Sequence, residues 1–254
     1  MTKPEKLHIL VTGAASGIGA ACARKLAKRN HVLFLHTGKN QEKLERLAQK
    51  LRTESGAKIC CYTADFNHPS RLVEMIAEIK GEVGHIDQLV LNAGYADKGD
   101  FHQLNSEKLR ASLAVIAESP ALLIKAFIQD IQNSQIGRIV AISSFVNKSI
   151  GANDTAFTIT TAAKSALEGL TMEAARQFRK SQATANIISP GYTRKDSEKS
   201  AFSEQQWREL ADKLPLGRLV EPDEVAGLVQ FLLSKQAAMI TGQNISIDSG
   251  LNLL

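Results

Sequence analysis

The stretch TITTAAKSALEGL, residues 158–170, carries the side chains best suited to chemistry. Lys164 and Thr160 are four residues apart, so on a helix their side chains lie on one face. The lysine offers a charged hydrogen-bond donor, and the threonine hydroxyl can both donate and accept. Ser144 adds a second hydroxyl directly after the apolar run IVAI. These groups are suited to holding a polar or anionic small molecule.

A glycine-rich turn, VTGAASGIG, follows the first apolar run and opens a helical stretch. Gly13, Gly17 and Gly19 allow the backbone to pass close to a pyrophosphate, which sits on the N–H groups of the helix N-terminus. A P-loop is excluded because no Lys-Ser/Thr pair follows Gly17. The pattern G-x-G-x-x-G also fits poorly, since it places Cys22 in the third glycine position. The turn therefore predicts a nucleotide site of another type.

Short apolar runs alternate with helical stretches along the whole chain. The predicted strands cover residues 7–13, 31–36, 58–66, 86–94, 137–144, 183–191 and 243–250, and the longer predicted helices cover roughly 106–134 and 155–180. Strands that are apolar on both faces and separated by helices indicate a parallel sheet covered on both sides. We therefore expect a single-domain α/β protein over residues 1–254, a Rossmann-like doubly wound sheet of about seven strands. Its ligands should bind at the carboxyl ends of the strands.

Composition narrows the classes of partner. A net charge of +5 with dispersed basic residues suits an anionic cofactor better than a nucleic-acid groove. The absence of a long apolar run and of a cleavage site predicts no membrane span and no signal peptide, hence a cytoplasmic protein. The three cysteines and six scattered histidines have no metal-ligand spacing, so no metal is expected.

Taken together, the motifs resemble those of the short-chain dehydrogenase/reductase family. The turn TGAASGIG matches its T-G-x-x-x-G-x-G, and LNAG, residues 91–94, resembles its N-N-A-G. IVAISS resembles the strand that ends in the family's catalytic serine, here Ser144, and AAKSALEGL resembles the helix with its active-site lysine, here Lys164. ISPGY and ITGQNISIDSG resemble its last two motifs. Within the family, SPALLIKAF and FTITTAAKSALEGLT look most like the pteridine reductases.

The resemblance implies a nicotinamide cofactor and the residues that hold it. They are Gly13, Ser16, Gly17, Ile18, Gly19, Lys39, Asp65, Asn92, Ala93, Gly94, Lys164, Pro190 and Gly191. An acidic residue after the second strand would repel a 2′-phosphate, but Gly38 stands there and Lys39 follows. A cation at this position can pair with a phosphate, so NADP(H) is preferred over NAD(H); alternatively, Lys39 is only a solvated loop residue. Asp65 would bind the adenine amino group.

The catalytic set departs from the family pattern in three places. Thr160 stands where the family has the tyrosine that donates a proton to the substrate oxygen. Ile116 replaces the asparagine that anchors a proton-relay water, and Lys195 replaces a threonine that binds the carboxamide. A tyrosine titrates near about 10, whereas an alcohol is closer to the roughly 15.7 of water. Loss of a matched general acid costs on the order of 10²–10⁴ in rate.

Two tyrosines are candidates for a substitute acid. Tyr95 directly follows NAG and Tyr192 directly follows PG, so both are expected at the pocket mouth, as a proton donor or as an aromatic wall.

Two functions remain open from the sequence. The first is a divergent NADP(H)-dependent oxidoreductase for an unknown carbonyl, alcohol or pterin-like small molecule, using Ser144 and Lys164, with Thr160, Tyr192 or a substrate group handling the proton. The second is a catalytically inactive cofactor-binding member that acts as a sensor or partner subunit. The resemblance also implies a homodimer or homotetramer.

Overall fold

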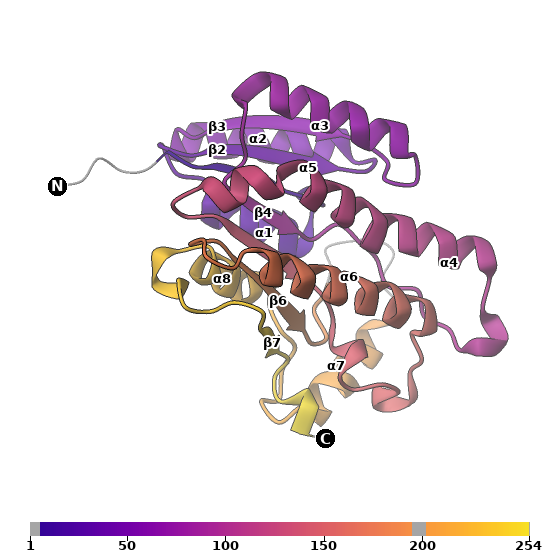
Figure 1. Ribbon diagram of the computed structural model, residues 1–254. Coiled ribbons are helices and arrows are strands. Elements are labelled where there is room, and N and C mark those ends of the chain that lie inside the picture. The colour runs from indigo at the N-terminus through magenta and orange to yellow at the C-terminus, as the bar shows by residue number, and fades with distance from the viewer. Residues whose placement is uncertain (1–5, 195–201, 254) are drawn as a thin grey trace.

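The computed structural model describes residues 6–194 and 202–253. Seven parallel strands form one sheet in the order β3-β2-β1-β4-β5-β6-β7 (Figure 1). The strands are β1 His8–Val11, β2 Val32–Thr37, β3 Lys58–Thr63, β4 Gln88–Leu91, β5 Arg138–Ile142, β6 Thr184–Pro190 and β7 Asn244–Ile247. The prediction of a doubly wound parallel sheet with about seven strands is confirmed.

The order of the strands fixes where a ligand can bind. From β1 the chain adds β2 and β3 on one side, then returns to place β4 on the other side of β1. The winding therefore reverses between β1 and β4, and this is the point at which a parallel sheet opens a crevice at the carboxyl ends of its strands. The glycine-rich turn directly follows β1, so it lies at this crevice.

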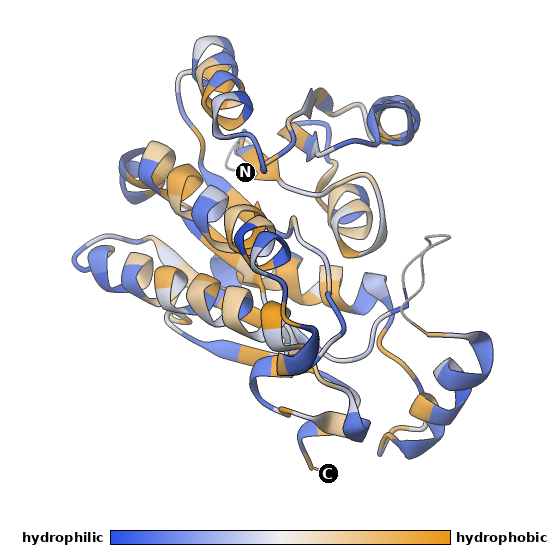
Figure 2. Cartoon of the chain, turned by 90° about the vertical axis from the view of Figure 1, so that its right-hand side faces the viewer, coloured by the Kyte–Doolittle hydropathy of each residue, from blue (hydrophilic) through white to orange (hydrophobic). Residues whose placement is uncertain are grey.

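Helices cover both faces of the sheet. One core contains buried side chains of α1 Gly17–Leu26, α2 Gln41–Ser55 and α8 Pro222–Leu232. The core on the opposite face contains those of α3 Pro69–Val83, α5 Ser119–Asn133 and α6 Thr158–Gln177. In Figure 2 the helices combine hydrophobic and hydrophilic sides, while the strands between them are hydrophobic. Strands such as β1 and β5 are buried along their whole length, as expected for a sheet covered twice.

The predicted helix over 106–134 is present but is not a regular α-helix throughout. It consists of α4 Ser106–Leu113, a π-helical turn Ala114–Glu118 and α5. The Ser119 hydroxyl donates to the Ala114 carbonyl at 2.8 Å within this turn. The segment 106–133 is long and apolar enough to cross a membrane, but half of its most apolar window is buried inside the fold, which suits the core helix of a globular protein. A π-turn inside a helix often marks a functional site.

A glycine and a proline set the bounds of two helices where the sequence indicates. Gly56 closes α2 with φ +67°, a left-handed conformation that glycine adopts without strain. Pro69 occupies the first turn of α3, where its missing N–H costs nothing. The helix expected over 155–180 is α6, Thr158–Gln177, and α7 Glu204–Lys213 follows β6 in the chain.

Candidate active site

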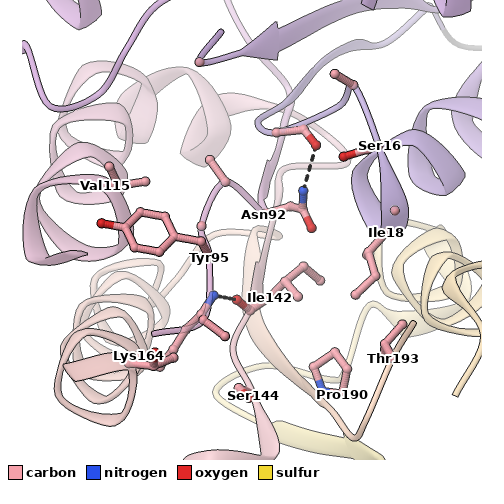
Figure 3. A pocket seen from close by; sticks show the side chains of 18 of the residues that line it. Ser16, Ile18, Asn92, Tyr95, Val115, Ile142, Ser144, Lys164, Pro190 and Thr193 are labelled. Carbon is pink, nitrogen blue, oxygen red and sulfur yellow. Dashed lines mark hydrogen bonds between the residues drawn. The ribbon is translucent and has the colours of Figure 1, made fainter. Parts of the chain in front are cut away.

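A set of hydrogen bonds between β1 and β4 shapes the crevice. The Asn92 side chain, just after β4, donates to the carbonyls of Thr12 at 2.9 Å and Gly13 at 3.1 Å, and Figure 3 draws one of these bonds. In return, the Thr12 hydroxyl accepts from the backbone N–H groups of Asn92 at 2.9 Å and Ala93 at 3.0 Å. We call this group the Thr12–Asn92 clamp. It holds the glycine turn and the NAG segment together as one rigid wall.

The turn requires glycines for two reasons: two of them have a positive φ, and a third lies too close to neighbouring atoms to carry a side chain. Gly13 and Gly17 have φ of +67° and +53°, values that other residues rarely adopt. A Cβ on Gly19 would stand 2.1 Å from the Gly13 carbonyl oxygen and 2.6 Å from the Asn92 amide nitrogen. Gly19 thus lets α1 start directly against the clamp. Ser16 precedes α1 without a side-chain capping bond, which leaves the first-turn N–H groups available to an anion.

His36, near the end of β2, supports the same turn from behind. Its Nε2 lies 2.8 Å from the Ala64 carbonyl, and its Nδ1 accepts from the Gly13 N–H at 3.4 Å. The ring also stacks on Phe66, with centroids 4.1 Å apart. Burial lowers the pKa of His36 to about 4, so the ring is neutral and can accept at Nδ1 while donating at Nε2. Sequence reasoning missed this residue because nothing in LFLHTG marks the histidine as a partner of the turn.

The crevice is a cavity of about 780 Å³ that brings the predicted residues together. It is lined by the predicted cofactor residues Gly13, Ser16, Gly17, Ile18, Lys39, Asp65, Asn92, Ala93, Gly94, Lys164, Pro190 and Gly191, and also by Ser144, Thr160, Tyr95 and Tyr192. Gly19 lies behind this lining, against the clamp. Lys195 lies outside the described residues.

At one end of the cavity Lys39 and Asp65 form an ion pair. The Lys39 ammonium lies 3.2 Å from the Asp65 carboxylate, and the lysine side chain is 79% exposed. Burial pushes the pKa of Asp65 up, but hydrogen bonds from Asn67 and Lys39 outweigh this and lower it. A pair this exposed contributes at most about 1 kcal/mol, so Lys39 can exchange its partner at little cost.

Lys164 occupies the middle of the cavity wall. Its ammonium donates to the Ile142 carbonyl, at the end of β5, at 2.6 Å (Figure 3). The side chain is buried, and the Nζ atom lies 3.5 Å from the point where a Cβ on Gly94 would stand. Gly94 therefore leaves room for the lysine beside the NAG segment. Ser144 follows β5 directly, and its Oγ accepts only a long bond from the Val146 N–H at 3.4 Å.

The Thr160 hydroxyl is already bound to the backbone. It accepts from the Asp97 N–H at 2.8 Å and lies 3.4 Å from the Asp97 carbonyl. The side chain is almost completely buried. Thr160 thus fixes the loop after β4 to α6, a structural task that the sequence did not reveal because the two residues are 63 positions apart.

Ile116 lies in the π-turn and is completely buried. Its side chain stands 3.2 Å from the position of a Cβ on Gly94, so it packs directly against the NAG segment. Val115, its neighbour in the turn, is the residue that lines the cavity. An apolar side chain at this position cannot hold a water by hydrogen bonds.

The two tyrosines differ in their freedom to donate a proton. The Tyr192 hydroxyl donates to the Ala152 carbonyl at 3.3 Å, and the ring packs on Phe145 with centroids 4.4 Å apart. This arrangement favours a role for Tyr192 as part of an aromatic wall over a role as proton donor. Tyr95 is 39% exposed at the cavity. Burial raises the pKa of both phenols, and for Tyr95 the carboxylates of Asp97 and Asp65 raise it further.

Glu168, one turn beyond Lys164 on α6, is a further residue that the sequence analysis missed. It accepts hydrogen bonds from the Ser143 hydroxyl and, at 2.9 Å, from the Asn147 amide. These bonds tie the segment on either side of Ser144 to the lysine helix. The signal in the sequence was an acidic residue four positions after Lys164, on the same face of the helix.

The histidines are less scattered in space than in the sequence. In the described part of the chain, possible ligand atoms of His8, His85 and Asp87 lie within 4.8 Å of one another, at the amino ends of β1 and β4, opposite the cavity. The Asp87 carboxylate already accepts from the His8 N–H at 2.8 Å and the Ser134 hydroxyl at 2.7 Å. Through these two hydrogen bonds the Asp87 carboxylate links β1 to the end of α5.

Comparison with known proteins agrees with this fold and cleft. A family model described as "Enoyl-(Acyl carrier protein) reductase" matches residues 13–252. A cis-4-hydroxycyclohexanecarboxylate dehydrogenase of Sinomonas cyclohexanicum is 32% identical over 243 residues, covering 95% of this chain and 94% of that protein.

Among solved structures, a short-chain dehydrogenase of Burkholderia cenocepacia in complex with NADP has a TM-score of 0.87 at 26% identity, covering 97% and 98% of the two chains. A blue fluorescent protein from a metagenomic library, in complex with NADPH, has a TM-score of 0.87 at 27% identity, covering 96% and 97%.

A doubly wound sheet with a glycine-rich turn at its winding reversal defines a nucleotide-binding α/β protein. The chain belongs to the short-chain dehydrogenase/reductase family.

Substitution of Gly19 tests the close approach at the turn. We expect Gly19→Ala to reduce NADPH affinity at least 100-fold, because the new methyl group displaces the Gly13 carbonyl or the Asn92 side chain. Gly81→Ala, in an exposed turn of α3 with open space around it, is the matched control and should leave affinity unchanged. Equal affinities for both variants, measured by calorimetry, would show that the turn is not part of a nucleotide site.

The neutral state of His36 predicts a pH-dependent stability. Its folded pKa of about 4 lies below 6.5, so between these values the unfolded chain binds more protons and stability falls as the pH falls. The contribution is on the order of 3 kcal/mol, present above pH 6.5 and lost by pH 4. We expect the difference in unfolding free energy between pH 7.5 and 5 to shrink in His36→Gln but not in the exposed control His102→Gln. Denaturant titration at both pH values measures this, and unchanged differences in both variants would refute the assignment.

Proposed function

We propose that this protein is an NADP(H)-dependent oxidoreductase that acts on a carbonyl or alcohol group of a small molecule. The observation that carries the proposal is the position of Lys164: a buried ammonium, held by the Ile142 carbonyl, beside the NAG segment and in the same cavity as Ser144. A buried ammonium is a strong hydrogen-bond donor, which suits it to hold the hydroxyl groups of a bound cofactor.

The residues of the cavity fit a dinucleotide. The α1 N-terminus with Ser16 and the glycine turn would hold the pyrophosphate, and Lys164 would hold the nicotinamide ribose. Asn92, Ala93, Gly94, Pro190 and Gly191 would form the walls. When bound, the cofactor supplies or accepts a hydride at the substrate carbon. The Burkholderia relative and the metagenomic relative, both crystallised with an NADP-type cofactor, support the same choice.

Preference for the 2′-phosphate rests on Lys39. The Lys39 ammonium is exposed at the cavity rim and paired with the partly buried carboxylate of Asp65, so it can turn to a phosphate. No carboxylate occupies position 38, because that residue is Gly38.

The proton on the substrate oxygen is handled without Thr160. Its hydroxyl is engaged with the Asp97 backbone, and Ile116 offers no hydrogen bond to a relay water. The Ser144 hydroxyl lines the cavity, where it accepts from the Val146 N–H and can donate its own O–H to a substrate oxygen. In reduction the carbonyl carbon gains the hydride and the oxygen gains a proton from solvent or from an acidic group of the substrate, giving an alcohol.

A catalytically inactive, cofactor-binding role is the second candidate. The observation in its favour is the use of the Thr160 hydroxyl as a structural bond between α6 and the loop after β4. Such a protein would sense the nicotinamide cofactor or act as a partner subunit. In either role we propose a cytoplasmic homodimer or homotetramer that binds neither nucleic acid nor membranes.

Lys39 should control the choice between the two nicotinamide cofactors. We expect Lys39→Ala to weaken NADPH binding about tenfold, the effect of losing one charged hydrogen bond, and to leave NADH binding unchanged. Lys50→Ala removes another exposed lysine that is also paired with a carboxylate, Glu54, and serves as control. Calorimetric titration with both nucleotides measures the effect, and equal losses for NADPH and NADH would contradict the assignment.

Restoration of the missing acid distinguishes the two candidate functions. If the wild type reduces a small ketone slowly, Thr160→Tyr with Ile116→Asn should raise kcat by about 10²–10⁴, and Lys164→Ala should abolish turnover. Thr160→Val, which keeps the shape but removes the hydroxyl and its bond to the Asp97 N–H, should lower the wild-type rate far less than Lys164→Ala does. An inert wild type that gains activity in the double variant identifies the binding role, and turnover that survives Lys164→Ala would rule out the enzymatic mechanism.

A further inference from the structure

Aromatic side chains are concentrated at the cavity. The chain has few of them, nine Phe, three Tyr and one Trp. Seven line the cavity: Phe66, Tyr95, Phe145, Phe157, Tyr192, Phe202 and Trp207. All but Phe66 and Tyr95 belong to, or pack on, a separate hydrophobic cluster around the end of β6 and α7, distinct from the two cores beside the sheet. We call these five rings the aromatic wall.

The rings of the aromatic wall are fixed by contacts with one another. Tyr192 packs on Phe145 at 4.4 Å between centroids, and Phe202 meets Trp207 edge to face at 4.9 Å. Tyr192 also meets both Phe202 and Trp207, at 5.9 and 6.5 Å. Since the Tyr192 hydroxyl is bound to the Ala152 carbonyl, the wall turns apolar ring surface rather than a polar group toward the cavity.

Carboxylates are scarce in the lining of the cavity. Among the described lining residues the only carboxylate is Asp65, at the Lys39 end of the cavity. Arg194 lines the cavity beside the wall, paired with Glu204, and the Lys98 ammonium lies 5.0 Å from the centre of the Phe202 ring. This distribution disfavours a cationic substrate and accepts a neutral or anionic one.

We propose that the substrate carries a flat ring system, neutral or anionic, that packs on the aromatic wall with its carbonyl or alcohol oxygen toward Ser144. The inference rests on the proposed function and specifies its substrate class. Flat rings gain edge and face contacts with rigid aromatic side chains, which a flexible acyl chain does not, and the acyl chain also loses more conformational entropy on binding. A pterin-like ring meets this description.

Trp207 provides a direct measurement because it is the only tryptophan of the chain and lines the cavity. The NADP⁺-loaded protein is titrated with 1-tetralone, a flat bicyclic ketone, and with 2-decanone, an open-chain ketone with the same number of carbon atoms. Trp207 emission and calorimetry are followed in parallel. We expect tetralone to change the emission saturably and to bind about tenfold more tightly than decanone, the effect of about two ring contacts.

Variants of the aromatic wall test whether contact with its rings causes the preference for tetralone. Tyr192→Leu should abolish the preference for tetralone, whereas Tyr192→Phe, which keeps the ring and loses the hydroxyl, should retain it. Phe231→Leu, an exposed aromatic residue on α8 outside the cavity lining, is the control. If NADP⁺ binds but decanone binds as tightly as tetralone or more tightly, the proposed substrate class is wrong while the proposed function stands. Failure to bind NADP⁺ overturns the proposed function and, with it, this inference.

Discussion

The Thr12–Asn92 clamp is the interaction on which the site depends. It joins the two strands between which the winding reverses, and it does so with one side chain on each: the amide of Asn92 and the hydroxyl of Thr12. Gly19 allows α1 to start against this pair. The N–H groups of the helix, the NAG segment and the lysine behind Gly94 are therefore placed by one small, rigid group of polar contacts.

The opposite wall of the cavity has a different character. There the polar groups expected to move protons are absent or engaged: Thr160 is bound to Asp97, Ile116 packs on Gly94, and Tyr192 is bound to Ala152. What remains is the Lys164 ammonium, the Ser144 hydroxyl, the Tyr95 phenol and a set of rings. Under the proposed function, the chain combines a nucleotide cleft with a substrate side on which aromatic surface takes the place of acid–base groups. The comparisons establish the family, and the chemistry at this second wall is the proposal.

Features encoded by short-range patterns could be predicted from the sequence. The strands are short apolar runs, the turn has its glycines within seven residues, and Lys164 stands on one helix with Thr160. Contacts between distant segments could not be predicted. His36 supports Gly13 across two strands, Thr160 binds Asp97 across 63 positions, and Glu168 binds Ser143 across 25. In the sequence these residues are ordinary polar side chains, and only the folded arrangement gives them partners. The aromatic wall was missed for the same reason, since its rings come from four separate segments.

The central claim is that this cleft holds NADP(H). The most direct test is calorimetric titration of the unmodified protein with NADPH and, separately, with NADH, because binding can be measured without knowledge of the substrate. The account predicts NADPH binding in the micromolar range, or about −8 kcal/mol, with NADH at least tenfold weaker. Absence of binding by both nucleotides would contradict it and would leave a family fold whose cleft serves no dinucleotide.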